Sequence, residues 1–300
     1  MITRHSVLAM CFLWLIAAHH LRAQTKELIF IRHGESYMNE VYHSNPVNII
    51  YRLTRDRAFL KDANINSNGI DQALRLHEAL KEQANNEHSQ LYSIANNILN
   101  PEESVMFLSS NLRRAANTGL IVRYGFVQPS QLSHPLHIVS ALQERFLSRV
   151  FVDTIPHTKS GSHLERLFQD GVPEGLKVFE PIQEDLFSTY WNYCGSGIHD
   201  NPELCAGNYY GDARNMDVKV RDVLDLIFFE GSQNGIDLSK RKTIVIFGHS
   251  LWLQQMLEFL DADSEYRQPW RLIPNCGVFH MKIENQGTQY FLKHSKLYQS

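Results

Sequence analysis

The chain has 300 residues, of which 43% are hydrophobic and 20% are charged. These are the proportions of a globular protein, and they exclude collagen-like, low-complexity and largely disordered chains. The formal net charge of −3 gives no electrostatic reason to expect nucleic acid as a partner.

The first 24 residues have the layout of a secretory signal peptide. A basic Arg4 precedes an unbroken apolar run of twelve residues from Val7 to Ala18, and Ala23 is a small residue suited to the position before a cleavage site. The run is short for a membrane span, which takes about 20 residues. We therefore expect residues 25–300 to be secreted or to work in the lumen of the secretory pathway. The alternative is a single-pass membrane anchor formed by residues 7–18.

Two cysteines, Cys194 and Cys205, flank a loop rich in Gly, Asn and Pro. In an oxidising compartment they can form a disulfide, and free thiols are the alternative. Their spacing is not that of a C-x-x-C zinc or redox motif.

Short apolar runs alternate with segments of helical periodicity along most of the chain. The predicted strands are Leu28–Ile31, Val105–Leu108, Leu136–Leu142, Thr243–Phe247, Gly277–Ile283 and Gln289–Lys293. The predicted helices cover residues 70–80, 89–99, 112–122, 218–229 and 251–260. This alternation predicts a three-layer α/β/α fold with a mainly parallel central sheet, in a single domain over residues 25–300.

Residues 155–215 interrupt the alternation. The stretch carries four prolines and several aromatic residues. We interpret it as a loop-rich insertion, or cap, over the active site, with one helix near Pro181 to Tyr193.

Two of the predicted strands are followed directly by histidines. Arg32 and His33 follow the first strand, and His249 follows the fourth and begins an apolar helix. In parallel α/β sheets, ligands bind beyond the carboxyl ends of the strands. A helix N-terminus there offers free N–H groups and a positive dipole end to an anion. Gly34 is expected to let the backbone approach a ligand closely.

A pair of arginines and a glutamate follow two other strands. Arg113 and Arg114 are adjacent at the start of a predicted helix, so they point about 100° apart and only one can face the strand ends. We expect that one to be Arg114, and Arg113 to lie in solvent. Glu144, close to the end of the third strand, can serve as a proton donor.

In their order along the chain, these motifs resemble the histidine phosphatase superfamily, and within it the phosphoglycerate-mutase-like branch. The residues that carry the resemblance are Arg32 to Ser36 with Asn39, Asn68–Gly69 with Gln72–Ala73, Ser110 to Ala115 with Thr118, Glu144, His249 and Asn275.

The resemblance implies a role for each candidate residue. His33 is the histidine that becomes phosphorylated, and Glu144 is the proton donor. The phosphoryl oxygens are bound by Arg32, Arg114 and His249, and polar contacts to the substrate come from Ser36 and Asn39. The arginines and a protonated His249 can supply the positive charge that phosphoryl transfer needs, so neither a metal nor a cofactor is expected. The implied activity is hydrolysis of a phosphomonoester, either a small phosphorylated compound or a phosphoprotein.

The sequence departs from the family pattern at Met38, Ile65–Asn66, Asn111 and Ser250. None of these changes removes a catalytic group, but together they argue against a housekeeping mutase. Two alternatives remain: a phosphoglycerate-mutase-type phosphotransferase and a catalytically silent module that binds a phosphorylated ligand.

A remote alternative is a serine α/β-hydrolase. Residues 248–252 resemble a nucleophile elbow around Ser250, and Asp261, Asp263, His280 and His294 follow in the order acid, then histidine. However, the elbow requires a second glycine where this chain has Trp252. This interpretation also leaves the arginines unexplained.

Overall fold

The computed structural model describes residues 23–45, 48–49, 62–129, 134–144, 174–182, 187–189, 216–228, 232–233, 236–237, 240–261, 273–287 and 289–298. The helices are α2 (Tyr37–Tyr42), α5 (Ser67–Ala84), α6 (Tyr92–Leu99), α7 (Arg113–Tyr124), α11 (Met216–Phe228) and α12 (Ser250–Phe259), with the 3₁₀ segments η1 (Ser140–Leu142) and η3 (Glu174–Ile182). The strands are β1 (Gln24–Arg32), β2 (Val105–Ser110), β3 (Leu136–Val139), β4 (Phe187–Thr189), β5 (Ser232–Gln233), β6 (Ile236–Asp237), β7 (Thr243–Gly248), β8 (Val278–Gln286) and β9 (Gln289–Tyr298).

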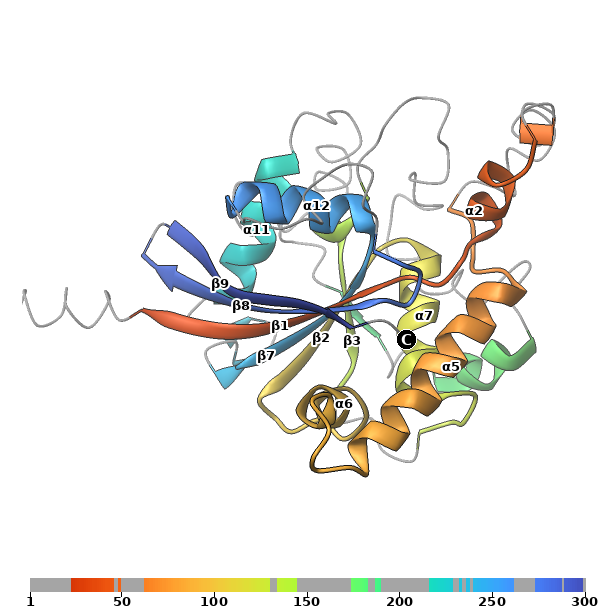
Figure 1. The fold of residues 1–300 in the computed structure, drawn as a ribbon, viewed down its shortest axis with the longest axis horizontal. Helices are drawn as coiled ribbons and strands as arrows, with labels where there is room; N and C mark the ends of the chain where they lie inside the picture. Colours follow the sequence, from red (N-terminus) through yellow and green to blue (C-terminus); the bar gives the residue numbers. More distant parts are fainter. Residues whose placement is uncertain are drawn as a thin grey trace, which may run out of the picture.

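A seven-stranded sheet with the order β4-β3-β2-β7-β1-β8-β9 forms the middle layer. The five strands from β4 to β1 are mutually parallel, while β8 runs antiparallel to both β1 and β9. Helices α11 and α12 cover one face of the sheet, and α5, α6 and α7 cover the other (Figure 1). The predicted three-layer α/β/α fold with a mainly parallel sheet is therefore confirmed.

The first strand shows why an unbroken apolar run folds in this way. Leu28 and Phe30 pack into the core beneath α11 and α12, whereas Ile29 and Ile31 pack into the core beneath the opposite helices. All four side chains are fully buried. A strand covered on both faces needs apolar residues at consecutive positions rather than at alternate ones.

The strand register brings the predicted site residues to one edge of the sheet. Arg32 of β1 pairs with Gly248 of β7, and Ser109 of β2 pairs with Phe247. The carboxyl ends of these three neighbouring strands therefore lie side by side. β3 is the next strand along, and its continuation through η1 leads to Glu144.

Each strand and helix predicted outside residues 155–215 has a counterpart, with shifts at some ends. The strand predicted over residues 136–142 is too long, because β3 ends at Val139 and η1 follows. β1 begins at Gln24, which is the last residue of the segment predicted to be a signal peptide.

Two described pieces of the predicted insertion belong to the body of the fold. β4 pairs in parallel with β3 at the edge of the sheet, so the helix expected near residues 181–193 is wrong at Phe187–Thr189. In η3, Leu176 and Phe179 are buried in the same core as α7, with the ring of Phe179 6.0 Å from that of Tyr124. Since Tyr124 is ten residues from Arg114 on a helix, this contact lies about 15 Å along α7 from the site.

The apolar run at residues 7–18 and the pair Cys194 and Cys205 lie outside the described residues. Within the described part of the chain, no helix combines the length and the apolar character that a membrane crossing requires.

Candidate active site

His33 lies at the point where β1 ends and is almost fully buried. Its backbone N–H donates to the carbonyl oxygen of Gly248 at 3.0 Å, which continues the pairing of β1 with β7. Its ring Nδ1 lies 2.6 Å from the carbonyl oxygen of Gly34. A carbonyl can only accept, so Nδ1 carries the proton and Nε2 keeps the lone pair that a nucleophile needs.

The loop after His33 is held against the N-terminus of α5 by its backbone. A Cβ on Gly34 would lie 2.5 Å from the carbonyl oxygen of Gly69, and a Cβ on Gly69 would lie 2.1 Å from that of Glu35. The backbone N–H of Asn66 donates to the same Glu35 oxygen at 3.0 Å. We expected Gly34 to let the backbone approach a ligand. Instead, the absence of a side chain at Gly34 allows the backbone of this loop to pack closely against the first turn of α5.

A threonine links this loop to α7. The backbone N–H of Gly34 donates to Thr118 Oγ1 at 3.0 Å, and the Thr118 hydroxyl donates to the carbonyl oxygen of Arg114 at 2.7 Å. The loop after His33 and helix α7, which carries Arg114, are thus fixed relative to each other.

The two arginines at the start of α7 point to different partners. Arg114 is 1% exposed, and its Nη2 donates to Glu144 Oε2 at 2.9 Å. Arg113 instead contacts Asp62: its backbone N–H donates to the carboxylate at 2.9 Å and its Nε donates to the Asp62 carbonyl at 3.0 Å. Arg113 is only 8% exposed, so the expectation that it lies in solvent is wrong.

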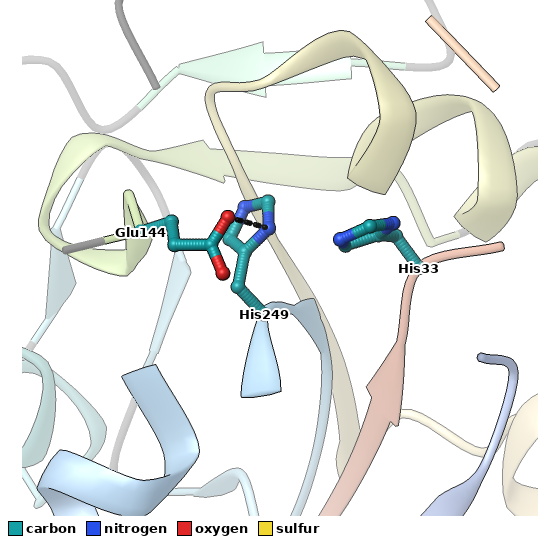
Figure 2. A group of neighbouring side chains, drawn as sticks. All are labelled: His33, Glu144 and His249. Atoms are coloured by element: carbon teal, nitrogen blue, oxygen red, sulfur yellow. Dashed lines mark ion pairs between the residues drawn. The ribbon is translucent and has the colours of Figure 1, made fainter. Parts of the chain in front are cut away.

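His249 faces both His33 and Glu144 (Figure 2). The ring centroids of the two histidines are 5.0 Å apart, and His249 Nδ1 lies 3.5 Å from Glu144 Oε2. On the other side of the ring, Nε2 lies 2.9 Å from the hydroxyl of Ser110, at the end of β2. One nitrogen or oxygen from each of His33, Glu144 and His249 lies within 4.8 Å of the others, so one small anion can contact all three.

Arg32 reaches this edge of the sheet from β1. Its Nη1 donates to the carbonyl oxygen of Ile273 at 2.5 Å, and its own carbonyl accepts the Cys276 backbone N–H at 3.1 Å. The turn before β8, which includes Asn275, therefore holds Arg32 in place.

Burial and the arginines keep both histidines neutral in the free protein. Burial lowers the pKa of His33 well below its ordinary value, and the positive charges of Arg114 and Arg32 lower it further. Burial, followed by Arg114, likewise lowers the pKa of His249. In the free protein the neutral His249 ring therefore offers an N–H donor, and the protonated His249 expected during phosphoryl transfer stays a prediction.

The same three side chains could in principle hold a metal ion, since histidine nitrogens and a carboxylate oxygen are common ligands. However, Arg114 already occupies Glu144 Oε2, and Arg114 and Arg32 both act electrostatically on His33. Two guanidinium charges beside the cluster oppose a dication and favour an anion.

Ser36 and Asn39 form the N-terminal cap of α2. The Asn39 backbone N–H donates to Ser36 Oγ at 3.2 Å, and the Ser36 backbone N–H donates to Asn39 Oδ1 at 3.0 Å. This capping box places both residues beside the loop after His33. Their contacts to the substrate stay a prediction.

The geometry gives no support to a serine nucleophile. The Ser250 hydroxyl donates to the carbonyl oxygen of Ile273 at 3.2 Å. His280 packs instead against His294, and it pairs with Ile29, three residues before the end of β1. Asp261 follows the far end of α12, about 15 Å along the helix from Ser250. Asp263 lies outside the described residues.

Sequence analysis missed the partners that orient these side chains. Asp62 carries no local signal, because it is 51 residues from Arg113. Ser110, Thr118 and Gln72 belong to the family motifs, but the sequence alone assigned them no contact.

Among solved structures, the chain is similar to a phosphoserine phosphatase from Entamoeba histolytica in complex with 3-phosphoglyceric acid, with 16% identity over 91% of this chain and 98% of that one and a TM-score of 0.42. It is similar to the ecdysone phosphate phosphatase from Bombix mori in complex with tungstate, with 13% identity over 92% of this chain and 94% of that one and a TM-score of 0.43. It is also similar to a mycobacterial glucosyl-3-phosphoglycerate phosphatase, with 14% identity over 89% of this chain and 97% of that one and a TM-score of 0.40. No family model and no curated protein matches the sequence.

The close packing of the loop on α5 makes Gly69→Ala a sharp test. Helix propensity alone predicts that this change stabilises the protein by about 1 kcal/mol. The new methyl group would instead meet the Glu35 carbonyl oxygen at 2.1 Å, so we expect a loss of about 1–3 kcal/mol in the free energy of unfolding. Urea denaturation shows whether the free energy of unfolding falls or rises in this variant. Ser67→Ala, an exposed change in the same helical turn, is the control and should stay within about 0.5 kcal/mol.

Proposed function

We propose that the protein is a metal-independent phosphatase of the histidine phosphatase type, which hydrolyses phosphomonoesters through a phosphohistidine at His33. The observation that carries the proposal is a buried, neutral His33 whose Nε2 is available for attack, next to Arg114, Glu144 and His249. Nucleophile, positive charge and a proton donor are the three components that such a two-step reaction requires.

In the first step, His33 Nε2 attacks the phosphorus atom in line with the bond to the leaving oxygen. The N–P bond forms as the P–O bond breaks, and charge develops on the oxygens of the transferred group. Arg32 and Arg114 supply the compensating charge, and His249 Nδ1 supplies a hydrogen bond. In the second step, water attacks the phosphohistidine and releases inorganic phosphate.

Glu144 handles the proton in both steps. Its carboxyl group lies beside Arg114 and His249, within reach of a leaving oxygen on a phosphoryl group at His33. Glu144 protonates the leaving alkoxide in the first step and, now ionised, removes a proton from water in the second.

Secretion is the second part of the proposal, and it rests on the layout of the first 24 residues. The proposed substrate is a small phosphorylated compound or a phosphoprotein, which a positively charged site at Arg32 and Arg114 would suit. A phosphoglycerate-mutase-type enzyme would use the same groups, and product analysis distinguishes it because the phosphoryl group would then pass to a second hydroxyl rather than to water. A silent binding module would be expected to lack at least one catalytic group. All five candidates are present at the same edge of the sheet, namely Arg32, His33, Arg114, Glu144 and His249.

The first test is to trap the phosphoenzyme. Rapid denaturation during turnover of a ³²P-labelled phosphomonoester should yield a labelled protein whose label is lost in acid and retained in base, as expected of a phosphohistidine. His33→Ala should abolish both labelling and turnover. His88→Ala, which changes an exposed histidine, should preserve both. Wild-type turnover by His33→Ala would refute the mechanism.

Metal independence is tested by chelation. Since Arg32 and Arg114 provide the positive charge, activity should be unchanged after exhaustive dialysis against EDTA. A zinc-dependent phosphatase treated in parallel should lose its activity. Complete loss here, with recovery on addition of Mg²⁺ or Zn²⁺, would show that a metal provides the charge instead.

Substitution of the two adjacent arginines should have different effects: Arg114→Ala should mainly lower activity, and Arg113→Ala should mainly lower stability. Arg114→Ala should lower kcat/KM by roughly 30- to 1,000-fold, because a charge-assisted phosphate contact contributes on the order of 2–4 kcal/mol to the transition state. Arg113→Ala removes the contacts of its guanidinium with the buried Asp62, so it should lower the free energy of unfolding by about 1–3 kcal/mol.

For the protein that remains folded, Arg113→Ala should change kcat/KM by less than about sixfold, equivalent to about 1 kcal/mol. Steady-state kinetics below the unfolding transition, together with urea denaturation of both variants, provide the comparison. A large kinetic defect in Arg113→Ala with normal kinetics in Arg114→Ala would reverse the assignment.

A further inference from the structure

Ser110 is buried at the end of β2, and its hydroxyl has two neighbours. Its Oγ accepts the backbone N–H of Leu112 at 3.3 Å and lies 2.9 Å from Nε2 of His249. The Leu112 amide can only donate. Among the described residues, Nε2 of His249 is the acceptor left for the proton of this buried hydroxyl, so we infer that the hydroxyl donates to Nε2 when the ring is neutral.

This contact determines which nitrogen of His249 carries the proton. A neutral imidazole has one N–H donor and one acceptor. If Nε2 accepts from Ser110, the proton sits on Nδ1, which is the nitrogen 3.5 Å from Glu144 Oε2. Nδ1 is buried and has no closer hydrogen-bond partner in the described part of the chain. Its N–H is thus directed to the space between Glu144 and His33.

We propose that Ser110 is a positioning residue, which fixes His249 in the Nδ1–H tautomer so that this N–H faces the transferred phosphoryl group. The inference rests on the proposed function for its catalytic consequence, but the tautomer itself is a property of the free protein. In the opposite tautomer, the lone pair of Nδ1 would face the oxygens of the phosphoryl group and repel them.

The electrostatics of the site agree with this role. The low pKa of His249 has burial as its first cause and Arg114 as its second. A hydrogen bond donated to the neutral ring by Ser110 acts in the same direction, because it favours the unprotonated form of Nε2. Removing the hydroxyl should therefore raise the pKa of His249.

The neighbouring serine provides a matched control. Ser109 is also fully buried on β2, but its side chain points to the opposite face of the sheet, as alternation along a strand requires. Its hydroxyl donates to the backbone carbonyl of Ser110 at 3.0 Å. Ser109→Ala thus removes a buried hydroxyl from the same strand without removing the contact with His249.

The first experiment reads the tautomer directly. Long-range ¹H–¹⁵N spectra of the ¹⁵N-labelled wild-type protein, with the His249 signals assigned by their loss in His249→Gln, should show a protonated Nδ1 and an unprotonated Nε2. Ser110→Ala should change this pattern and shift the titration of the ring to higher pH, and Ser109→Ala should change neither. A protonated Nε2 in the wild-type protein would overturn the proposal without any Ser110 variant.

The second experiment reads the catalytic consequence. Ser110→Ala should lower kcat by about 10- to 100-fold, by analogy with the loss of residues that orient metal-ligating histidines, with little change in KM. In this mechanism the neutral His249 ring is the active form. The acidic limb of the pH–rate profile should therefore move to higher pH in Ser110→Ala. Ser110→Thr, which keeps the hydroxyl, should restore kcat and the profile where urea denaturation shows that it folds.

The outcomes separate this inference from the proposed function. A wild-type protein with the Nδ1–H tautomer and no phosphatase activity would contradict the function and leave the tautomer assignment standing. An active enzyme in which Ser110→Ala and Ser109→Ala have equal kcat and identical ¹⁵N patterns would contradict the inference and leave the function standing.

Discussion

The parallel pairing of β1 with β7 is the constraint on which both the core and the site depend. Six residue pairs hold the two strands, from Glu27 with Thr243 to Arg32 with Gly248. A slip of one residue would turn Leu28 and Phe30 to the opposite face of the sheet and disrupt both cores. The same slip would move His33 relative to His249. The apolar packing that stabilises the fold therefore also fixes the distance between the two histidines.

This arrangement solves an electrostatic conflict within the site. In the proposed mechanism, a histidine must be neutral to act as a nucleophile, whereas a site for a phosphate group must be positive. Burial and the guanidinium of Arg114 lower the pKa of both His33 and His249, so the positive charge that would favour a phosphate also keeps the proposed nucleophile unprotonated. Glu144 offsets part of that charge by pairing with Arg114, which limits the cost of burying the guanidinium in the free protein.

The sequence predicted the parts of the molecule that depend on local patterns. The apolar runs at residues 28–31 and 243–247 and the histidines that follow them identified the central strands and the edge of the sheet where the site lies. Contacts between distant residues could not be predicted in this way. Nothing near Arg113 in the sequence indicates that Asp62 is its partner, and exposure at the start of a helix was the simplest expectation. The strand β4 was missed because three residues are too few to show a period.

The contacts around the loop after His33 explain why the motif residues extend far beyond the proposed catalytic groups. Gln72 Oε1 accepts the backbone N–H of Glu35 at 2.9 Å, and Thr118 accepts that of Gly34. Asn66 caps α5 and donates through its side-chain amide to the Glu35 carboxylate at 2.8 Å. A short loop that exposes a histidine at the end of a strand has few hydrogen bonds of its own, so helices α5 and α7 must satisfy its backbone. The orientation of His33 thus depends on residues outside the proposed catalytic set, and their spread along the chain follows from the order in which these helices surround the end of β1.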